Sequence, residues 1–223
     1  MARALSTVRL AVRDHLDEDS ASYWTDASLT RQIVRSASAL WKRIVQIRKD
    51  YFLSATPGTL TLASGTFRYA LPSDFFEVKL IRTTTSGQEN VAWRPAHMAS
   101  AKFIEGLRSD ITINSPSEFL YQIVANQTIV VSPIPRAVLV AAVEYVALPV
   151  EPSADADTFG ALDPFLDYVE YDAAAKLLAK GPVGDPAYWQ NMADKEWIAI
   201  LLALDKFRSR QDGDFVEGMF EGY

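Results

Sequence analysis

Residues 25–51 read TDASLTRQIVRSASALWKRIVQIRKDY. Apolar residues recur through this stretch at steps of three and four, a spacing that places them on one face of an α-helix. Thr25 is suited to cap the free backbone N–H groups of a helix that begins at Asp26. The stretch therefore predicts an amphipathic helix that runs to about Tyr51 and is on the order of 35 Å long. Its apolar face is formed by Leu29, Ile33, Ala37, Leu40, Ile44 and Ile47.

A shorter amphipathic helix is predicted before this one. Four apolar residues recur at steps of three and four ahead of an acidic cluster at 17–19. They are Leu5, Val8, Val12 and Leu16. The chain is therefore expected to begin with two helices that pack through their apolar faces.

Two further helices are predicted near the C-terminus. Asp163-Pro164 and Asp185-Pro186 each join an N-cap carboxylate to the residue best suited to the first helical position. The first of these helices is expected to end near Lys180 and the second near Arg208. The second, with apolar residues along one face, is expected to form the core together with the helix that begins at Asp26. These apolar residues are Trp189, Ala193, Trp197, Ile200, Leu201 and Leu204.

Between the helical ends the apolar pattern changes to that of β-strands. Two strands flank Ala63-Ser64-Gly65 and predict a β-hairpin, and two others are joined around Ala125-Asn126-Gln127. A polar turn is predicted at 86–90 and a short helix at Pro95–Leu107. The predicted strands are Thr59–Leu62, Thr66–Leu71, Val78–Thr84, Phe119–Val124, Thr128–Ser132 and Val138–Val146.

The predicted fold is therefore α+β. A helical bundle, with two N-terminal and two C-terminal helices, encloses a central, mostly antiparallel β insertion and is followed by an extended C-terminal tail. The corresponding segments are 1–56 for the N-terminal helices, 57–147 for the β insertion, 148–208 for the linker and C-terminal helices, and 209–223 for the tail.

The composition predicts a soluble protein made in the cytoplasm. Of its 223 residues, 49% are hydrophobic, yet no apolar run approaches the roughly 20 residues needed to cross a bilayer. The absence of cysteine excludes disulfides, thiolate metal ligands and thiol nucleophiles. The net charge of -6 is concentrated after residue 50, where thirteen Lys or Arg face twenty-two Asp or Glu. Such a chain is a poor candidate for tight, phosphate-driven DNA binding.

Few residues are candidates for catalysis or metal binding. His15 and His97 are far apart in sequence and lack a partner at a metal-binding or catalytic spacing, so they are interpreted as surface or loop residues. The sequence contains no phosphate-binding loop, dinucleotide fingerprint, zincin motif or nucleophile elbow. We therefore expect no metal, no organic cofactor and no enzymatic activity.

Carboxylates are the remaining catalytic candidates, because two acids that face each other across a cleft can hydrolyse glycosides. Two clusters stand out in the sequence, one on a predicted helix face and one after the first predicted helix. They are Asp163, Asp167 and Glu170, and Asp14, Asp17 and Glu18. We favour the simpler interpretation for Asp163 and Asp167, namely that they stabilise a helix N-terminus.

Four basic residues, Arg31, Arg35, Lys42 and Arg43, lie along the helix that begins at Asp26. Two interpretations are open for them. They form a nucleic-acid-binding face, or they are the solvated side of an amphipathic helix and pair with acids on a neighbouring subunit. We favour the second interpretation and expect these residues at a subunit interface.

The C-terminal segment Gln211–Tyr223 has four acids, no Lys or Arg, three glycines and five large apolar residues. Its glycines raise the entropic cost of ordering, so it is expected to be mobile alone and to order on a partner. The expected anchors are Phe215, Val216, Met219, Phe220 and Tyr223.

Three short motifs in this order carry a family resemblance. They are Tyr23-Trp24-Thr25-Asp26-Ala27-Ser28-Leu29, then Gly65 with Tyr69-Ala70-Leu71-Pro72-Ser73-Asp74-Phe75, then Ile129-Val130-Val131-Ser132-Pro133-Ile134-Pro135 with a return strand that ends at Glu144-Tyr145. Residues 5–207 resemble, in the order of their elements, the head-to-tail adaptor proteins of tailed bacteriophages. These proteins are also called connector, head-completion or tail accessory proteins.

The resemblance implies a ring, typically of twelve copies, in the virion neck beneath the portal protein. It implies that the C-terminal segment docks on the portal and that the tail or the next neck protein binds the opposite side. Double-stranded DNA would pass through the channel without sequence-specific binding, and acidic subunits would favour passage because they repel phosphates weakly. The resemblance transfers no catalytic motif, although muralytic activity has been attributed to some podophage tail accessory proteins.

The sequence thus predicts a structural head-to-tail adaptor that is not an enzyme. Two alternatives remain. One is a carboxylate-dependent cell-wall hydrolase associated with a phage tail, which would use Asp163 or Asp167. The other is a nucleic-acid-binding module that uses the helix beginning at Asp26.

Overall fold

The structure is a computed structural model that describes residues 2–18, 23–83, 94–95, 120–124, 127–132, 134–135, 138–181 and 185–220. The chain divides into two compact units. Residues 1–48 and 149–223 form a helical unit, and Lys49–Leu148 form a β unit. The helical ends and the mostly antiparallel middle predicted from the sequence are confirmed.

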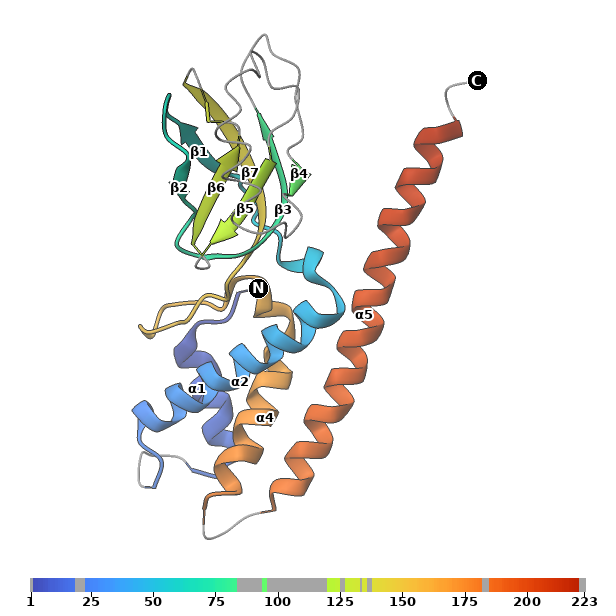
Figure 1. Cartoon of the computed structure of the whole chain (residues 1–223). Coiled ribbons are helices and arrows are strands. Elements are labelled where there is room, and N and C mark those ends of the chain that lie inside the picture. Colours follow the sequence, from blue (N-terminus) through green and yellow to red (C-terminus); the bar gives the residue numbers. More distant parts are fainter. Residues whose placement is uncertain are drawn as a thin grey trace. The chain divides into compact units, whose positions relative to one another are not determined.

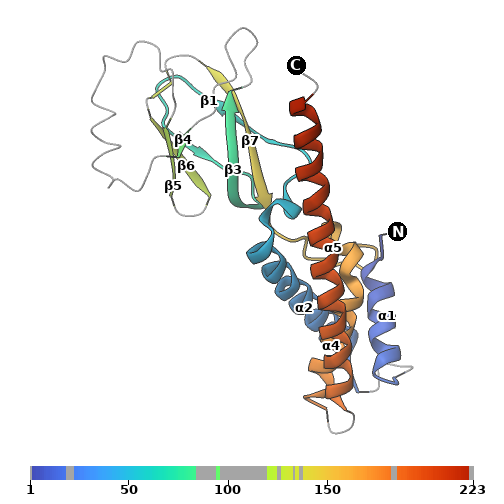
Figure 2. The same cartoon turned by 90° about the vertical axis from the view of Figure 1, so that its right-hand side faces the viewer.

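The helical unit is arranged around one short helix, α4 (Leu166–Leu178). Helix α4 contacts α1 (Leu5–His15), α2 (Asp26–Ile47) and α5 (Pro186–Phe220), and it lies among these three helices in both views (Figures 1 and 2). A 3-10 helix, η2 (Gly160–Phe165), leads into it. Its apolar residues occur on all sides, which is typical of a buried helix. Those that are buried are Leu166, Tyr168, Val169, Ala173, Ala174, Ala175 and Leu177.

Helix α2 confirms the prediction for residues 25–51 in most respects. It begins at Asp26, and the Thr25 hydroxyl accepts a hydrogen bond of 3.3 Å from the backbone N–H of Ser28. The predicted apolar face is buried up to Ile44. Ile47 is instead 57% exposed, because α2 ends there and the chain continues as a separate 3-10 helix, η1 (Lys49–Phe52).

Helix α5 contributes less to the core than its apolar pattern predicts. Among its described side chains, those of Ala193, Ile200 and Leu204 are buried, whereas Leu201 is half-buried. The expectation that α2 and α5 together form the core is therefore wrong. Helix α4 occupies the centre, and α5 contacts it along one side only.

Helix α5 is also longer than predicted. It has 35 residues, about 52 Å at 1.5 Å per residue, whereas α4 has 13, about 20 Å. More than half of α5 therefore extends beyond α4. The prediction of an extended backbone after Arg208 is wrong up to Phe220. Extending an existing helix by one residue gains one hydrogen bond and fixes the backbone of one residue only, so it is easier than starting a helix. Each glycine in this segment destabilises the helix by about 1 kcal/mol relative to alanine, and the helix continues through them.

One sheet of the β unit has three antiparallel strands in the order β1-β7-β3. They are β1 (Gly58–Leu62), β7 (Leu139–Ala147) and β3 (Phe75–Thr83). Leu60 lies opposite Ala141. Helix η1 lies in the β unit, and the residue after it, Leu53, forms a β-bridge with Val146.

The second sheet has four strands in the order β2-β6-β5-β4. Its pairs β2–β6 and β5–β6 are antiparallel, and the short pair β4–β5 is parallel. The strands are β2 (Arg68–Ala70), β6 (Thr128–Ser132), β5 (Leu120–Val124) and β4 (Arg94–Pro95). The pairing of β5 with β6 confirms the second predicted hairpin. Apart from Pro95, the predicted helix at Pro95–Leu107 lies outside the described residues, as does the turn at 86–90.

The first predicted hairpin is wrong, since β1 and β2 belong to different sheets. Gly65 has a φ of 76°, and its N–H donates to the carbonyl of Pro135 rather than closing a two-strand turn. The chain thus crosses from one sheet to the other at this point. The two sheets share one apolar core, to which Leu60, Leu62, Phe75, Ile81, Tyr121, Ile129, Val131, Ala141, Val143 and Tyr145 contribute.

The contrast between two leucines tests the assignment of the helical core. Leu40 is fully buried on α2, whereas Leu202 is 61% exposed on α5. We expect Leu40→Ala to lower the free energy of unfolding by about 2–5 kcal/mol, because it leaves a cavity. We expect Leu202→Ala to change it by no more than about 0.5 kcal/mol. Chemical denaturation measures both values, and equal losses would contradict the assignment.

Candidate functional site

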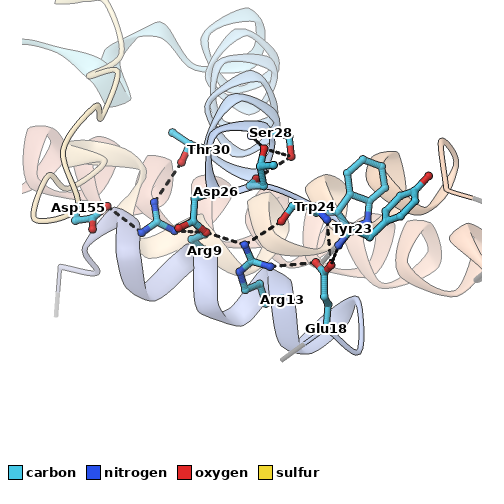
Figure 3. Close-up of polar contacts among 10 residues, drawn as sticks. Arg9, Arg13, Glu18, Tyr23, Trp24, Asp26, Ser28, Thr30 and Asp155 are labelled. Atoms are coloured by element: carbon cyan, nitrogen blue, oxygen red, sulfur yellow. Dashed lines mark hydrogen bonds and ion pairs between the residues drawn. The ribbon is translucent and has the colours of Figure 1, made fainter. Parts of the chain in front are cut away.

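A buried arginine ties the end of α1 to the start of α2 (Figure 3). The side chain of Arg13 is only 8% exposed. Its Nη1 donates to Glu18 Oε2 at 3.0 Å, and its Nη2 donates to Asp26 Oδ1 at 2.7 Å and to the carbonyl of Trp24 at 3.0 Å. The planar guanidinium thus binds three acceptors that follow α1 in the sequence. We call this set of contacts the Arg13 lock.

The carboxylate of Glu18 holds the residues just before α2 (Figure 3). Its Oε1 accepts the backbone N–H groups of Tyr23 at 2.5 Å and Trp24 at 3.0 Å, while Oε2 binds Arg13. Asp17 turns the chain after α1 with a φ of 54°, a conformation that aspartate tolerates better than most residues. Both oxygens of Glu18 therefore fix the approach to α2.

Arg9 extends the lock to the linker before α4. Its Nε lies 3.5 Å from Asp26 Oδ1, and its Nη2 donates to Asp155 Oδ1 at 2.9 Å (Figure 3). The hydrogen bond from Arg13, together with the charges of Arg9 and Arg13, lowers the pKa of Asp26 despite some desolvation. Asp26 therefore stays ionised and joins two arginines of α1 to the start of α2.

These contacts give a physical role to residues 23–29, the first of the three motifs. Trp24 supplies a carbonyl acceptor, Thr25 a cap and Asp26 an ion pair, while Leu29 is fully buried. The motif is thus the start of α2 and part of the Arg13 lock. The residue type and position of Thr25 identify the cap in the sequence. The sequence gives no signal for the role of Arg13, because Arg13 is not one of the periodic apolar residues of α1.

A second arginine engages the carboxylates considered as catalytic candidates. Arg3 Nη2 lies 2.7 Å from Asp167 Oδ1, and its Nη1 lies 2.9 Å from Glu170 Oε1. Glu170 is 7% exposed, and burial raises its pKa from 4.5 to about 7; the charge of Arg3 opposes this rise and that of Asp167 adds to it. Asp167 and Glu170 are thus partners in an ion pair between the N-terminal segment and α4.

The other acids of the two clusters are separate from this pair. Asp163 Oδ1 accepts the N–H of Phe159 at 3.1 Å within the first turn of η2. The dipeptide Asp163-Pro164 therefore does not mark the first residue of α4, because a 3-10 turn that begins at Gly160 precedes it. Asp14 and Asp17 are exposed. By contrast, Asp185 caps α5 as predicted, since its carboxylate accepts the N–H of Ala187 at 2.9 Å.

The linker caps α1 with its backbone. Ala4, the N-cap residue of α1, makes no side-chain cap. Instead the N–H of Leu5 donates to the carbonyl of Asp157 at 2.8 Å, and that of Ser6 donates to the carbonyl of Asp155 at 3.1 Å. Two of the N–H groups that a helix start leaves unpaired are thereby satisfied. This capping holds the segment before α4 against α1, and Arg3 holds the N-terminal segment against α4 itself.

His15 is not the surface or loop residue that the sequence suggests. Its ring lies 4.3 Å from the ring of Trp189 and 5.2 Å from that of Tyr171, and Nε2 is buried without a hydrogen-bond partner. Burial lowers its pKa, although the carboxylates of Asp14 and Asp167 oppose this. His15 therefore packs as a neutral aromatic side chain where α1, α4 and α5 meet. His97 lies outside the described residues.

The four basic residues of α2 fall into two groups. Arg43 is bound within its own unit, because Nη1 donates to Tyr168 Oη at 2.7 Å and the guanidinium stacks 3.9 Å from the centre of the Trp197 ring. Arg31, Arg35 and Lys42 are exposed and form no ion pair with any described residue. They lie on the side of α2 opposite its buried residues, and we call them the basic ridge.

An apolar pocket of about 190 Å³ lies beside the start of α4. It is half open to solvent and lies between the end of η2, the first turn of α4 and the middle of α5. Its walls include Phe165, Tyr168, Ala199 and Ala203, with the carboxylates of Asp167 and Glu196. The tail anchors Phe215, Val216, Met219 and Phe220 lie on the helical backbone of α5 with side chains outside the described set, and Tyr223 is also outside it.

Among the described residues, no helix is long and apolar enough to span a membrane. The same residues contain no group of three or more histidine, aspartate or glutamate side chains placed to hold a metal ion.

Comparison with known families identifies the class of protein. The sequence pattern of the SU10 adaptor protein family matches residues 3–214, nearly the whole chain. The chain therefore belongs to the SU10 adaptor protein family, which confirms the resemblance to phage head-to-tail adaptors. No curated protein matches the chain.

Arg13 and Arg31 are a matched pair for testing the lock, because one is buried with three acceptors and the other is exposed without an ion pair to any described residue. Arg13→Ala leaves Glu18 buried without its cation, and we expect a loss of about 3 kcal/mol in the free energy of unfolding. We expect Arg31→Ala to change it by no more than about 0.5 kcal/mol. Urea denaturation distinguishes the two, and a loss below 1 kcal/mol for Arg13→Ala would refute the lock.

Glu170 predicts a pH dependence of stability. Its folded-state pKa is raised from 4.5 to about 7, so the folded state binds a proton that the unfolded state has released between these values. The stabilising effect is complete below pH 4.5 and is lost as the pH rises to 7, on the order of 3 kcal/mol for full burial. We expect Glu170→Gln to flatten the fall in melting temperature between pH 5 and 8 relative to the parent chain. Glu151→Gln, at an exposed site, is the control and should leave the profile unchanged.

Proposed function

We propose that this protein is a structural head-to-tail adaptor that forms a ring beneath the portal and joins the DNA-filled capsid to the tail. The observation that carries the proposal is membership of a phage adaptor family over residues 3–214. The protein would act in the virion neck, as a ring of twelve copies around a channel for double-stranded DNA. Its portal-binding segment would be the end of α5, from Gln211 onward.

The shape of α5 supports this assignment of the portal-binding segment. The last buried side chain described on α5 is that of Leu204, and the helix continues for 16 more residues to Phe220. The part of a helix that extends beyond the helix it packs against can bind a partner protein. Because residues 211–223 contain four acids and no Lys or Arg, the complementary surface would be basic and apolar.

We also propose that the protein has no catalytic role. Glycoside hydrolysis needs two carboxylates that face each other across a substrate cleft. Asp167 and Glu170, the closest candidates, are instead bridged by Arg3. DNA passage without tight binding is supported by the net charge of -6.

A truncation tests the portal-binding segment. A chain that ends at Arg208 should keep its melting temperature within about 2 °C, because every described buried residue of α5 precedes the cut. It should no longer co-sediment with the purified portal protein of the same phage. The full-length variant Phe215→Ser/Phe220→Ser should lose binding too, whereas Tyr188→Ser, at an exposed aromatic residue near the start of α5, should bind normally. Undiminished binding by the truncated chain would refute this part of the proposal.

A further inference from the structure

The pocket beside the start of α4 has the size of a side-chain site. Its volume is about 190 Å³, below the roughly 300–1,000 Å³ of pockets that bind small organic ligands. All of its walls belong to the helical unit, so it is formed within one packed body. A single long side chain from another protein molecule would fill it.

The walls of the pocket suit an arginine. Phe165 and Tyr168 supply aromatic surface, and Ala199 and Ala203 leave room beside α5. Arginine packs its apolar stem and its guanidinium plane against aromatic rings, and it pairs with carboxylates through its fork.

Carboxylates are present at the same place. Glu196 lines the pocket and forms no ion pair with any described residue, and Asp167 remains 53% exposed although Arg3 contacts it. Glu170 lies beside Asp167 and shares the same arginine. Asp167 and Glu170 therefore share one cation, Arg3. The carboxylate of Glu196, which has no ion-pair partner among the described residues, favours a second cation at the pocket.

A basic surface that complements the acidic pocket lies on another face of the helical unit. The basic ridge, Arg31, Arg35 and Lys42, spans 12 residues of α2, or about 16 Å, and has no ion-pair partner among the described residues. The buried residues of α2 face α4, so the ridge faces away from the pocket of its own subunit. One subunit therefore has a cationic ridge and an anionic apolar pocket on different faces.

We propose that copies of this chain join head to tail, with the basic ridge of one copy seated on the α4–α5 pocket of the next and Arg35, its middle cation, inserted. This inference rests on the proposed ring. Two different, complementary patches are what a heterologous contact requires, and such a contact closes into a ring when its rotation closes. An isologous pair of ridges would bring like charges together.

Cysteine cross-linking tests the contact. Because the chain contains no cysteine, only the introduced thiols can react. Two full-length variants, Arg35→Cys and Ala199→Cys, are mixed and treated with a short bismaleimide. We expect one cross-linked dimer from the mixture and none from either variant alone. The double variant Arg35→Cys/Ala199→Cys should give a ladder of multimers. The control Arg35→Cys/Asp194→Cys places the second thiol at an exposed residue about 140° around α5 from Ala199 and should give no ladder.

Charge exchange provides a second test. Glu196→Lys should weaken self-association in sedimentation by on the order of tenfold, and adding Arg35→Glu to it should restore association. The inference is overturned if multimers form without the Arg35–Ala199 cross-link, if Arg35→Cys cross-links to itself, or if the exchanged pair does not recover. Rings in electron micrographs together with these negative results would leave the proposed function intact and reject only this contact.

Discussion

The structure of the helical unit depends on one buried cation. Arg13 reaches from α1 to the residues that start α2, and its three acceptors hold the start of α2 against the end of α1. Helices α1 and α2 then cover two sides of α4, which leaves one side for α5. A buried guanidinium without these acceptors would carry a large desolvation cost, so the turn and the ion pairs stabilise each other.

Features that depend on neighbouring residues could be predicted from the sequence. Thr25 and Asp185 cap helices, and the pairing of β5 with β6 follows from a short turn between two regular strands. Features that depend on distant residues could not. The central position of α4 gives no amphipathic signal because its apolar residues surround it. The separation of β1 from β2 depends on a hydrogen bond from Gly65 to Pro135, 70 residues later.

The candidate site was predicted only in outline. The basic residues of α2 could be identified by type and spacing. The sequence does not show which of them are bound within the subunit and which are exposed, because Arg43 contacts Tyr168 and Trp197 only in the folded chain. The carboxylates Asp167 and Glu170 could also be recognised in the sequence, but their partner Arg3 lies more than 160 residues away. An adaptor is consistent with both observations: its charged groups either fix the subunit or remain on its surface, where assembly would use them.

Electron microscopy of the full-length chain bound to the portal protein of the same phage tests the central claim most directly. The account predicts a closed ring coaxial with the portal, with the end of α5 against the portal and a central opening wide enough for double-stranded DNA, about 20 Å. Isolated monomers on the portal, open filaments, or a contact made without the end of α5 would contradict it.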